Sequence, residues 1–460
     1  MSIYILTDFG STYTKMMAVD VDKGEIIAFS KSFTTIETDV TEGYNNALAG
    51  IKSQLGDFVP AVFLACSSAA GGLKIVSSGL VPDLTAKASR LAAASAGGKV
   101  VKTYSYELTE FEMEEITAIN PDIVLLSGGI DGGNKKVLLQ NAETIAKTEG
   151  DFFVIVAGNR SGAMEARKIL EGGGKRVIVC ENVMPTFGKL NIDPTKVAIR
   201  DLFIENIVSA KGLDKVAGMM DMEIIPTPLA VYEACELLSK GCEGEKGLGE
   251  LMAYDLGGAT CDVYSMADGL PKSGAFISGI QEPFAKRTVE GDIGMRYSLH
   301  ALYDLICEEG GLGDFDQGDV ADWLDICKSN PDVLPQGEYS KYAQIDSSFA
   351  GWAIRLSAAR HVGYVERIFT PSGEVFSQEG KDLTRVEYII GSGGAVINAP
   401  DPKMILQEAS YSPRDLNALK PQNPKILLDK ENALAAMGLL ARRHPDIALR
   451  IMKNSFTEIE

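Results

Sequence analysis

The chain has few of the residues that build a structural metal site from nitrogen or sulfur. It contains only three histidines, and none of its seven cysteines belongs to a C-x-x-C pair. Structural zinc sites use closely spaced Cys and His ligands. The sequence therefore predicts no structural zinc. Scattered unpaired cysteines are typical of a reducing compartment, so we expect a cytoplasmic protein.

Long apolar runs are also missing. No stretch reaches the roughly 18 uninterrupted apolar residues that suggest a membrane-spanning helix. The first residues reach Asp8 with neither the basic start nor the apolar core of a signal peptide. The expectation is a chain without a membrane partner.

An excess of basic residues is absent as well. The chain has 44 Lys and Arg against 63 Asp and Glu, which gives a net charge of −19. Such a surface repels a phosphate backbone, and no basic stripe offsets this repulsion, so a nucleic-acid partner is not expected. A small anionic ligand is still allowed, because backbone N–H groups can hold it locally.

Length and pattern predict an α/β protein of at least two domains. The 460 residues exceed what one hydrophobic core usually supports. Short apolar runs such as Ile123–Leu126 alternate with helical segments such as Lys135–Lys147, and a long helix is expected over Ser347–Ile368. A stretch rich in Gly, Glu and Lys near residue 245 separates predicted domains at 1–245 and 250–460.

Glycine is plentiful, with 47 residues in short runs. Two of these runs look alike, Asp8-Phe9-Gly10-Ser11-Thr12-Tyr13-Thr14-Lys15 and Asp255-Leu256-Gly257-Gly258-Ala259-Thr260-Cys261-Asp262. Each has an Asp at the end of an apolar strand, a glycine turn, and a returning strand. Glycine lets backbone N–H groups approach phosphate oxygens, and Ser or Thr adds hydroxyl donors. One copy alone would be an ordinary hairpin, but two copies predict a duplicated domain with a nucleotide held in an inter-domain cleft.

The candidate site residues follow from this chemistry. Asp8 and Asp255 are predicted to hold Mg²⁺ through water molecules, and Asp255 to position the attacking water, unless they only cap their turns. Lys15 is predicted to neutralise phosphate charge, unless it is a solvated strand lysine. The predicted catalytic residues are Asp255, Asp8 and Lys15, and the predicted phosphate-binding residues are Gly10, Ser11, Thr12, Lys15, Gly257, Gly258 and Thr260.

These segments resemble known ATPases. Asp255–Asp262 looks like the second phosphate loop of Hsp70, and Asp8–Lys15 is similar to the first phosphate loop of actin. Gly391-Ser392-Gly393-Gly394, after the apolar strand Glu387–Ile390, fits the adenosine-binding turn of the same superfamily. The resemblance implies that Gly391, Gly393 and Gly394 contact the adenosine of ATP. The resemblance implies two ribonuclease-H-like domains of the actin, Hsp70 and sugar-kinase type, with a large insertion in the first.

A closer resemblance covers nearly the whole chain. Five segments resemble the glutamate mutase accessory family, called MutL or GlmL: Asp8–Lys15, Cys66–Leu73, Ser127–Gly133, Asp255–Ser265 and Thr288–Arg296. This resemblance implies an ATP-driven reactivating factor for a coenzyme-B12-dependent mutase or aminomutase, which releases damaged cobalamin so that intact cofactor can enter. The implied partner is therefore a protein, and the implied activity is that of a slow ATPase.

Two other functions stay open. A small-molecule kinase of the same fold, for a sugar or a carboxylate, would need an Asp general base, and Asp131 is the candidate. A nucleotide-binding regulator with negligible turnover is the other. The segment Thr288–Arg296 could start a helix that lines the cleft, with or without a nucleotide or metal role. Asp262 either lies behind the site or has no role there. The loops Cys66–Leu73 and Ser127–Gly133 either bind the partner or cap helices.

Overall fold

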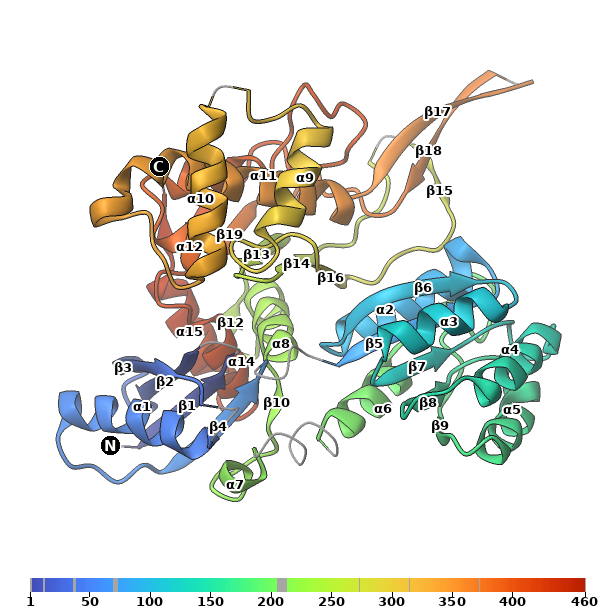
Figure 1. The fold of residues 1–460 in the computed structure, drawn as a ribbon, viewed down its shortest axis with the longest axis horizontal. Coiled ribbons are helices and arrows are strands. Elements are labelled where there is room, and N and C mark those ends of the chain that lie inside the picture. Colours follow the sequence, from blue (N-terminus) through green and yellow to red (C-terminus); the bar gives the residue numbers. More distant parts are fainter. Residues whose placement is uncertain are drawn as a thin grey trace. The chain divides into compact units, whose positions relative to one another are not determined.

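The computed structural model describes residues 2–10, 13–35, 39–68, 73–204, 213–272, 274–313, 315–371 and 373–459 (Figure 1). The chain forms two compact units. The first comprises Met1–Leu237, Cys242–Glu245 and Leu434–Ile451, and the second comprises Leu238–Gly241, Lys246–Ala433 and Met452–Glu460. The C-terminal segment Leu434–Ile451 thus packs with the first unit. The domains 1–245 and 250–460 stay a prediction.

The main sheet of the first unit has the strand order β10-β4-β1-β2-β3. Strands β1 (Ile3–Phe9), β2 (Tyr13–Asp20) and β3 (Glu25–Phe33) form an antiparallel meander, while β4 (Val62–Ser67) runs parallel to β1 and β10 (Ile225–Pro226) parallel to β4. Helix α1 (Val40–Leu55) joins β3 to β4 and buries Tyr44, Ala47 and Ile51. This order brings the carboxyl ends of three parallel strands to one edge.

The main sheet of the second unit repeats this topology. Its order is β16-β14-β13-β19-β20-β21, from β13 (Leu251–Leu256), β14 (Cys261–Met266), β16 (Ala285–Glu290), β19 (Tyr388–Ser392), β20 (Lys425–Leu428) and β21 (Thr457–Glu458). If the strands of each main sheet are counted in chain order and β21 is left out, both sheets have the same spatial order, 3-2-1-4-5. Helix α11 (Ala343–His361) joins the third strand to the fourth, as α1 does. The repeated strand order confirms the predicted duplication within an α/β fold.

A second sheet is inserted in the first unit between β4 and β10. Its five parallel strands have the order β6-β5-β7-β8-β9. The elements run, in chain order, β5 (Lys74–Gly79), η1 (Pro82–Ala86), α2 (Lys87–Ser95), β6 (Lys99–Ser105), α3 (Glu110–Ile119), β7 (Ile123–Leu126), α4 (Lys136–Lys147), β8 (Phe153–Val156), α5 (Arg160–Gly172) and β9 (Arg176–Val179). All four residues of β7 are buried, as a parallel strand covered on both faces requires.

The remaining elements complete the two units. They are α6 (Asp193–Phe203), α7 (Asp214–Ala217), α8 (Thr227–Lys240), β11 (Gly241–Cys242), β12 (Glu245–Lys246), β15 (Phe276–Ser278), α9 (Leu299–Glu308), α10 (Gln317–Ser329), η3 (Gly337–Tyr342), β17 (Tyr364–Thr370), β18 (Gly373–Glu379), α12 (Gly394–Ile397), α13 (Pro402–Gln407), α14 (Leu434–Ala441) and α15 (Pro445–Ser455). Helices α8 and α14 approach closely. A Cβ atom at Gly438 would lie 1.9 Å from the Ala230 carbonyl oxygen, so only glycine fits there.

The long helix predicted over 347–368 was wrong at its C-terminal end. Helix α11 ends at His361, and strand β17 starts at Tyr364. Between them Gly363 lies so close to β18 that a Cβ atom would be 2.5 Å from the Glu379 carbonyl oxygen. Most of the residues that follow, Tyr364–Thr370, are β-branched or aromatic, and such residues favour a strand over a helix.

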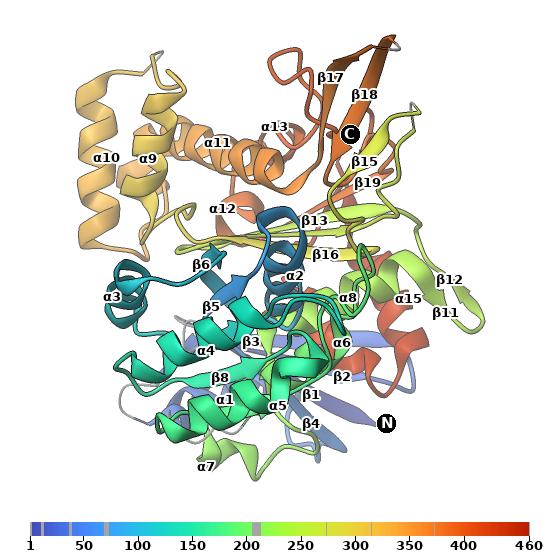
Figure 2. The same cartoon turned by 90° about the vertical axis from the view of Figure 1, so that its right-hand side faces the viewer.

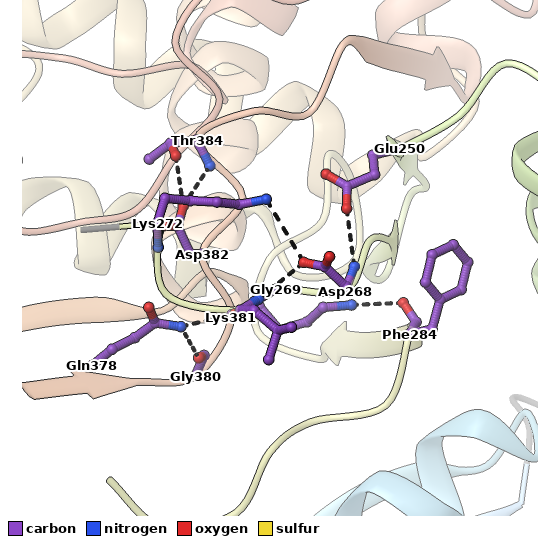
Figure 3. Close-up of polar contacts among 11 residues, drawn as sticks. Glu250, Asp268, Gly269, Lys272, Phe284, Gln378, Gly380, Lys381, Asp382 and Thr384 are labelled. Atoms are coloured by element: carbon purple, nitrogen blue, oxygen red, sulfur yellow. Dashed lines mark hydrogen bonds and ion pairs between the residues drawn. The ribbon is translucent and has the colours of Figure 1, made fainter. Parts of the chain in front are cut away.

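A buried polar network fixes the base of the β17–β18 hairpin to the second unit (Figure 3). The Lys381 side chain is 1% exposed, and its Nζ donates to the carbonyl oxygens of Phe284 at 2.7 Å and Pro283 at 3.1 Å. Gln378 Nε2 donates to the carbonyl oxygen of Gly269 at 2.8 Å. Burial, with a smaller contribution from the neighbouring Lys286, lowers the pKa of Lys381 from its ordinary value of 10.5 to about 7.

We expect Lys381 to make the stability of the second unit depend on pH. Between pH 7 and 10.5 the unfolded chain holds a proton that the folded chain does not, so the free energy of unfolding rises with pH. The acidic neighbours Glu282, Glu250 and Asp268 oppose this shift without cancelling it. In Lys381→Met the slope of the unfolding free energy against pH should fall by about 1.4 kcal/mol per pH unit between pH 8 and 9.5.

Urea unfolding at several pH values tests this expectation. Both tryptophans, Trp323 and Trp352, belong to the second unit, so their fluorescence reports on it selectively. The control is Gln378→Leu, which removes an anchor without a titrating group and should lower stability at every pH with the slope kept. Equal slopes in wild type and Lys381→Met would contradict the lowered pKa.

Candidate functional site

The two glycine turns share one backbone geometry. The Gly10 N–H donates to the Tyr13 carbonyl at 3.0 Å, and the Gly257 N–H donates to the Thr260 carbonyl at 2.9 Å. In the first turn a Cβ atom at Gly10 would lie 2.7 Å from the Tyr13 oxygen, so glycine is required. The predicted contacts of Ser11 and Thr12 lie outside the described residues.

In the first turn, Asp8 is held by neighbours from two other strands. Cys66 lies beside it in register on β4, with Sγ 3.5 Å from Asp8 Oδ1. Thr227, the first residue after β10, donates its hydroxyl to the same oxygen at 2.6 Å. Burial, reinforced by the charge of Asp8, raises the pKa of Cys66 well above its ordinary value, so the thiol stays protonated. Both neighbours therefore fix one carboxylate oxygen of Asp8.

Lys15 lies directly opposite Asp8 on β2. Residues opposite each other in an antiparallel pair project from the same face of the sheet, so both side chains point the same way. No hydrogen bond or ion pair joins the Lys15 ammonium to another residue in the described part of the chain. Its charge is thus available to an anion at this face.

The second turn is supported from behind by the segment after β16. The N–H groups of Met295, Arg296 and Tyr297 donate to the carbonyl oxygens of Gly257 and Gly258 at 2.8 to 3.0 Å. These carbonyls are therefore occupied, and the turn is fixed by backbone contacts. Close packing also requires Gly294, where a Cβ atom would lie 2.5 Å from the Ala259 carbonyl carbon.

The side chains of this supporting segment are used in structural contacts. Arg296 pairs with Asp346 at 3.0 Å and donates to the Val333 carbonyl at 2.8 Å. Arg360, at the end of α11, pairs with Glu290 at 3.0 Å and with Asp292 at 2.7 Å. The segment starts no helix, because α9 begins only at Leu299. The structural role of residues 288–296 is to hold the second turn in place.

Asp262 occupies in the second turn the position that Lys15 has in the first. It pairs with the buried Arg287, whose Nε is 2.8 Å and Nη2 2.5 Å from Asp262 Oδ1. Burial is the largest single influence and disfavours the charge of Arg287, but Asp262 and Tyr264 together outweigh it and raise the pKa of the guanidinium. The other oxygen accepts from the Thr260 hydroxyl at 3.3 Å. The described structure thus places a free lysine in the first turn and a neutralised pair in the second.

The glycine turn after β19 packs against the end of β13. Ser392 lies in register with Asp255, and Gly393 follows with φ +95°. A Cβ atom at Gly393 would lie 2.2 Å from the Leu256 carbonyl oxygen, whereas at Gly394 the nearest atom would be Asn398 Nδ2 at 3.9 Å. Asn432 Oδ1 accepts from the Gly393 N–H at 3.3 Å. The turn is therefore joined directly to the strand that carries Asp255.

Sequence reasoning missed Thr227, Asp429 and Asn432. Asp429 follows β20 and is 1% exposed, and its Oδ2 lies 3.5 Å from the Ser392 hydroxyl. Each of these residues follows the fifth strand of its sheet. A polar residue directly after a two- to four-residue apolar run is a weak signal, and only the strand order shows what it contacts.

Comparison with known proteins decides the family. The family described as MutL protein matches residues 4–456. Protein MutL of Clostridium tetanomorphum is 43% identical over 470 aligned residues, which cover the whole of both chains. The chain belongs to the MutL family. The resemblance inferred from the five sequence segments is thereby confirmed.

Solved structures related to this MutL family member are distant. Xylulose kinase from Lactobacillus acidophilus is 11% identical with a TM-score of 0.36, and 100% of this chain and 93% of that chain are covered. The activator of 2-hydroxyisocaproyl-CoA dehydratase from Clostridium difficile is 10% identical with a TM-score of 0.32, at 100% and 99% coverage. Ethanolamine utilization protein EutJ from Carboxydothermus hydrogenoformans is 10% identical with a TM-score of 0.31, at 98% and 90% coverage. These likenesses concern the fold alone.

In this MutL family member, Asp131 ties loops together. Its Oδ1 accepts from the Arg160 N–H at 2.9 Å and from Asn182 Nδ2 at 3.0 Å. Asn182 also donates to the Gly129 carbonyl at 2.9 Å, so the loop after β7 is bonded to the loops after β8 and β9. The loop Ser127–Gly133 is thus internally braced. Of the loop Cys66–Leu73, residues 69–72 lie outside the described part.

The residues suit magnesium better than a metal caged by protein. Among the described residues, no three His, Cys, Asp or Glu side chains gather as a metal site. Magnesium is commonly held by one or two carboxylates, with water and substrate phosphates completing its shell. Asp8 and Asp255, one strand-end carboxylate in each unit, are the donors that would meet that preference. No helix in the described ranges is long and apolar enough to cross a membrane.

Proposed function

We propose that this chain is an ATP-dependent reactivating factor for a coenzyme-B12-dependent mutase of the glutamate mutase type. The observation that carries the ATP part is the pair of glycine turns with one backbone geometry, each following an Asp at a strand end. Membership of the MutL family supports the mutase part.

In this proposal the two turns have different tasks. The first turn brings a positive charge to the phosphates through Lys15, while Thr227 and Cys66 keep Asp8 in place. The second turn, fixed by residues 295–297, holds Asp255 where it can orient the attacking water. Gly391, Gly393 and Gly394 provide a backbone surface for the adenosine. Asp8 and Asp255 would hold Mg²⁺ through waters, and the metal when bound would neutralise phosphate charge.

Two kinds of measurement test the proposal together. ATP hydrolysis by the purified chain is measured with Mg²⁺, alone and with an inactivated B12-dependent mutase plus fresh adenosylcobalamin. We expect recovery of mutase activity that requires ATP. Recovery without ATP, or ATP hydrolysis stimulated by a metabolite and not by the mutase, would contradict the proposal, the latter in favour of a kinase.

We expect Lys15→Gln to lower ATP hydrolysis by at least about 10-fold, because it removes a charge that stabilises the transition state. The control is Lys31→Gln. Lys31 lies next to Lys15 in register on β3 and is exposed, so this change removes an equal charge one strand further from Asp8. Equal losses of ATP hydrolysis in the two variants would show that Lys15 acts only through the overall electrostatic field of the protein.

A further inference from the structure

The second unit carries a three-stranded sheet of order β15-β18-β17 outside its main sheet. Strands β17 and β18 form an antiparallel hairpin, and β15 pairs with the basal part of β18. The hairpin extends away from the rest of its unit in both views (Figures 1 and 2). We call residues 276–278, 364–371 and 373–379 the arm.

Large apolar side chains of the arm are uncovered. Phe369 is 77% exposed, Phe276 49% and Phe376 41%, and Tyr364 and Ile368 are also exposed. A small sheet normally buries one face against a helix or another sheet, because two or three bare strands are barely stable in water. Exposed apolar groups gathered on one element mark a surface for a macromolecular partner.

The strand register places the two phenylalanines of the hairpin on one face. Arg367 lies opposite Phe376, and Phe369 lies opposite Glu374, so these four side chains share that face. Arg367 and Glu374 pair with each other at 2.9 Å. The face is therefore aromatic and nearly neutral, in a chain whose net charge is −19.

The base of the arm is firmly anchored although its outer part is bare. Lys381 and Gln378 bond to buried backbone carbonyls of the main body of the unit (Figure 3). On the opposite edge, the Val365 N–H donates to the Asn417 carbonyl at 3.0 Å. Such anchoring presents the aromatic face in a fixed direction, which lowers the ordering cost of binding.

We propose that the arm is the surface through which this chain docks to its protein partner, an apolar groove on the B12-dependent mutase; this rests on the proposed function. A neutral aromatic face suits a partner protein, where aromatic anchors in apolar pockets dominate binding. A second copy is disfavoured because both copies carry −19. A lipid surface is disfavoured because the single cation of the arm, Arg367, is already paired with Glu374.

The test is a double variant, Phe369→Ser with Phe376→Ser, compared with Phe111→Ser with Phe187→Ser. In the control pair, Phe111 on α3 is 80% exposed and Phe187, in the segment between β9 and α6, is 70% exposed. Binding to the purified mutase is measured by surface plasmon resonance, after thermal unfolding has shown that each variant is folded. We expect Kd to rise at least about 30-fold for the arm variant and less than about 3-fold for the control.

The outcomes separate this inference from the proposed function. If wild type binds the mutase and the arm variant binds equally well, the arm inference alone is overturned. If wild type does not bind the mutase at all, the proposed partner falls and the arm inference falls with it. If the arm variant instead abolishes self-association in sedimentation, the occupant is a second copy. If it abolishes binding to phosphatidylcholine vesicles, the occupant is a lipid surface. Either result would make the inference wrong.

Discussion

Replacing Asp255 by asparagine is expected to reduce ATP hydrolysis by at least about 100-fold, the usual range for a lost positioning or proton-accepting carboxylate. Asparagine keeps the size of the side chain, and the turn itself is held by the backbone contacts of residues 295–297 to Gly257 and Gly258. The fold should therefore survive. ATP should still bind, because the glycine turns and Lys15 are untouched.

The measurement is single-turnover ATP hydrolysis beside equilibrium binding of ATP. Asp304→Asn is the control, since Asp304 is exposed on α9 of the same unit and its loss changes net charge equally. Near-wild-type turnover in Asp255→Asn would assign the catalytic task elsewhere. Loss of ATP binding with turnover per bound ATP unchanged would make Asp255 a binding residue only.

The two turns could be predicted from sequence because their geometry is local. Strand, glycine and returning strand lie within eight residues, and their hydrogen bonds close within the same segment. The duplication of the domain was predicted because the motif occurs twice. Local pattern therefore accounts for Asp8, Lys15 and Asp255 being placed at strand ends.

The partners of these residues could not be predicted in the same way. Thr227 reaches Asp8 from 219 positions away, and Asn432 contacts Ser392 across 40 positions. Such contacts depend on strand order, which no short window of sequence contains. The arm was missed for a different reason: the helix expected over 347–368 was extended into its first strand, because apolar and charged residues come in pairs from Tyr364 to Phe369 and give no period-two signal.

The asymmetry of the turns has a consequence for the duplicated site. Equivalent positions carry a free Lys15 and a paired Asp262, although the backbone around them is alike. At this position the first turn thus presents a lysine ammonium, and the second an aspartate that is already paired with Arg287. We infer that the two halves cannot exchange roles, so substitutions at matching positions should have unlike effects on ATP binding and hydrolysis.

Gly393→Ala is expected to damage both the stability of the second unit and ATP binding, whereas Gly394→Ala should be tolerated. At Gly393 the backbone has φ +95°, and a Cβ atom would lie 2.2 Å from the Leu256 carbonyl oxygen. The neighbouring Gly394 begins α12, and the nearest atom to its Cβ would be 3.9 Å away. The two changes add the same methyl group one residue apart, so only backbone geometry distinguishes them.

The expected loss for Gly393→Ala is about 2–4 kcal/mol of unfolding free energy, from backbone strain and the clash together. Because Leu256 connects Asp255 to Gly257, any shift that relieves the clash also displaces the second turn. ATP affinity should therefore fall by at least about 10-fold, since positioned backbone donors lose their alignment with the phosphates. Urea unfolding followed by tryptophan fluorescence and calorimetric titration with ATP measure the two effects. If Gly393→Ala matches Gly394→Ala in both, the glycine turn is not joined to the phosphate turn as the structure places it.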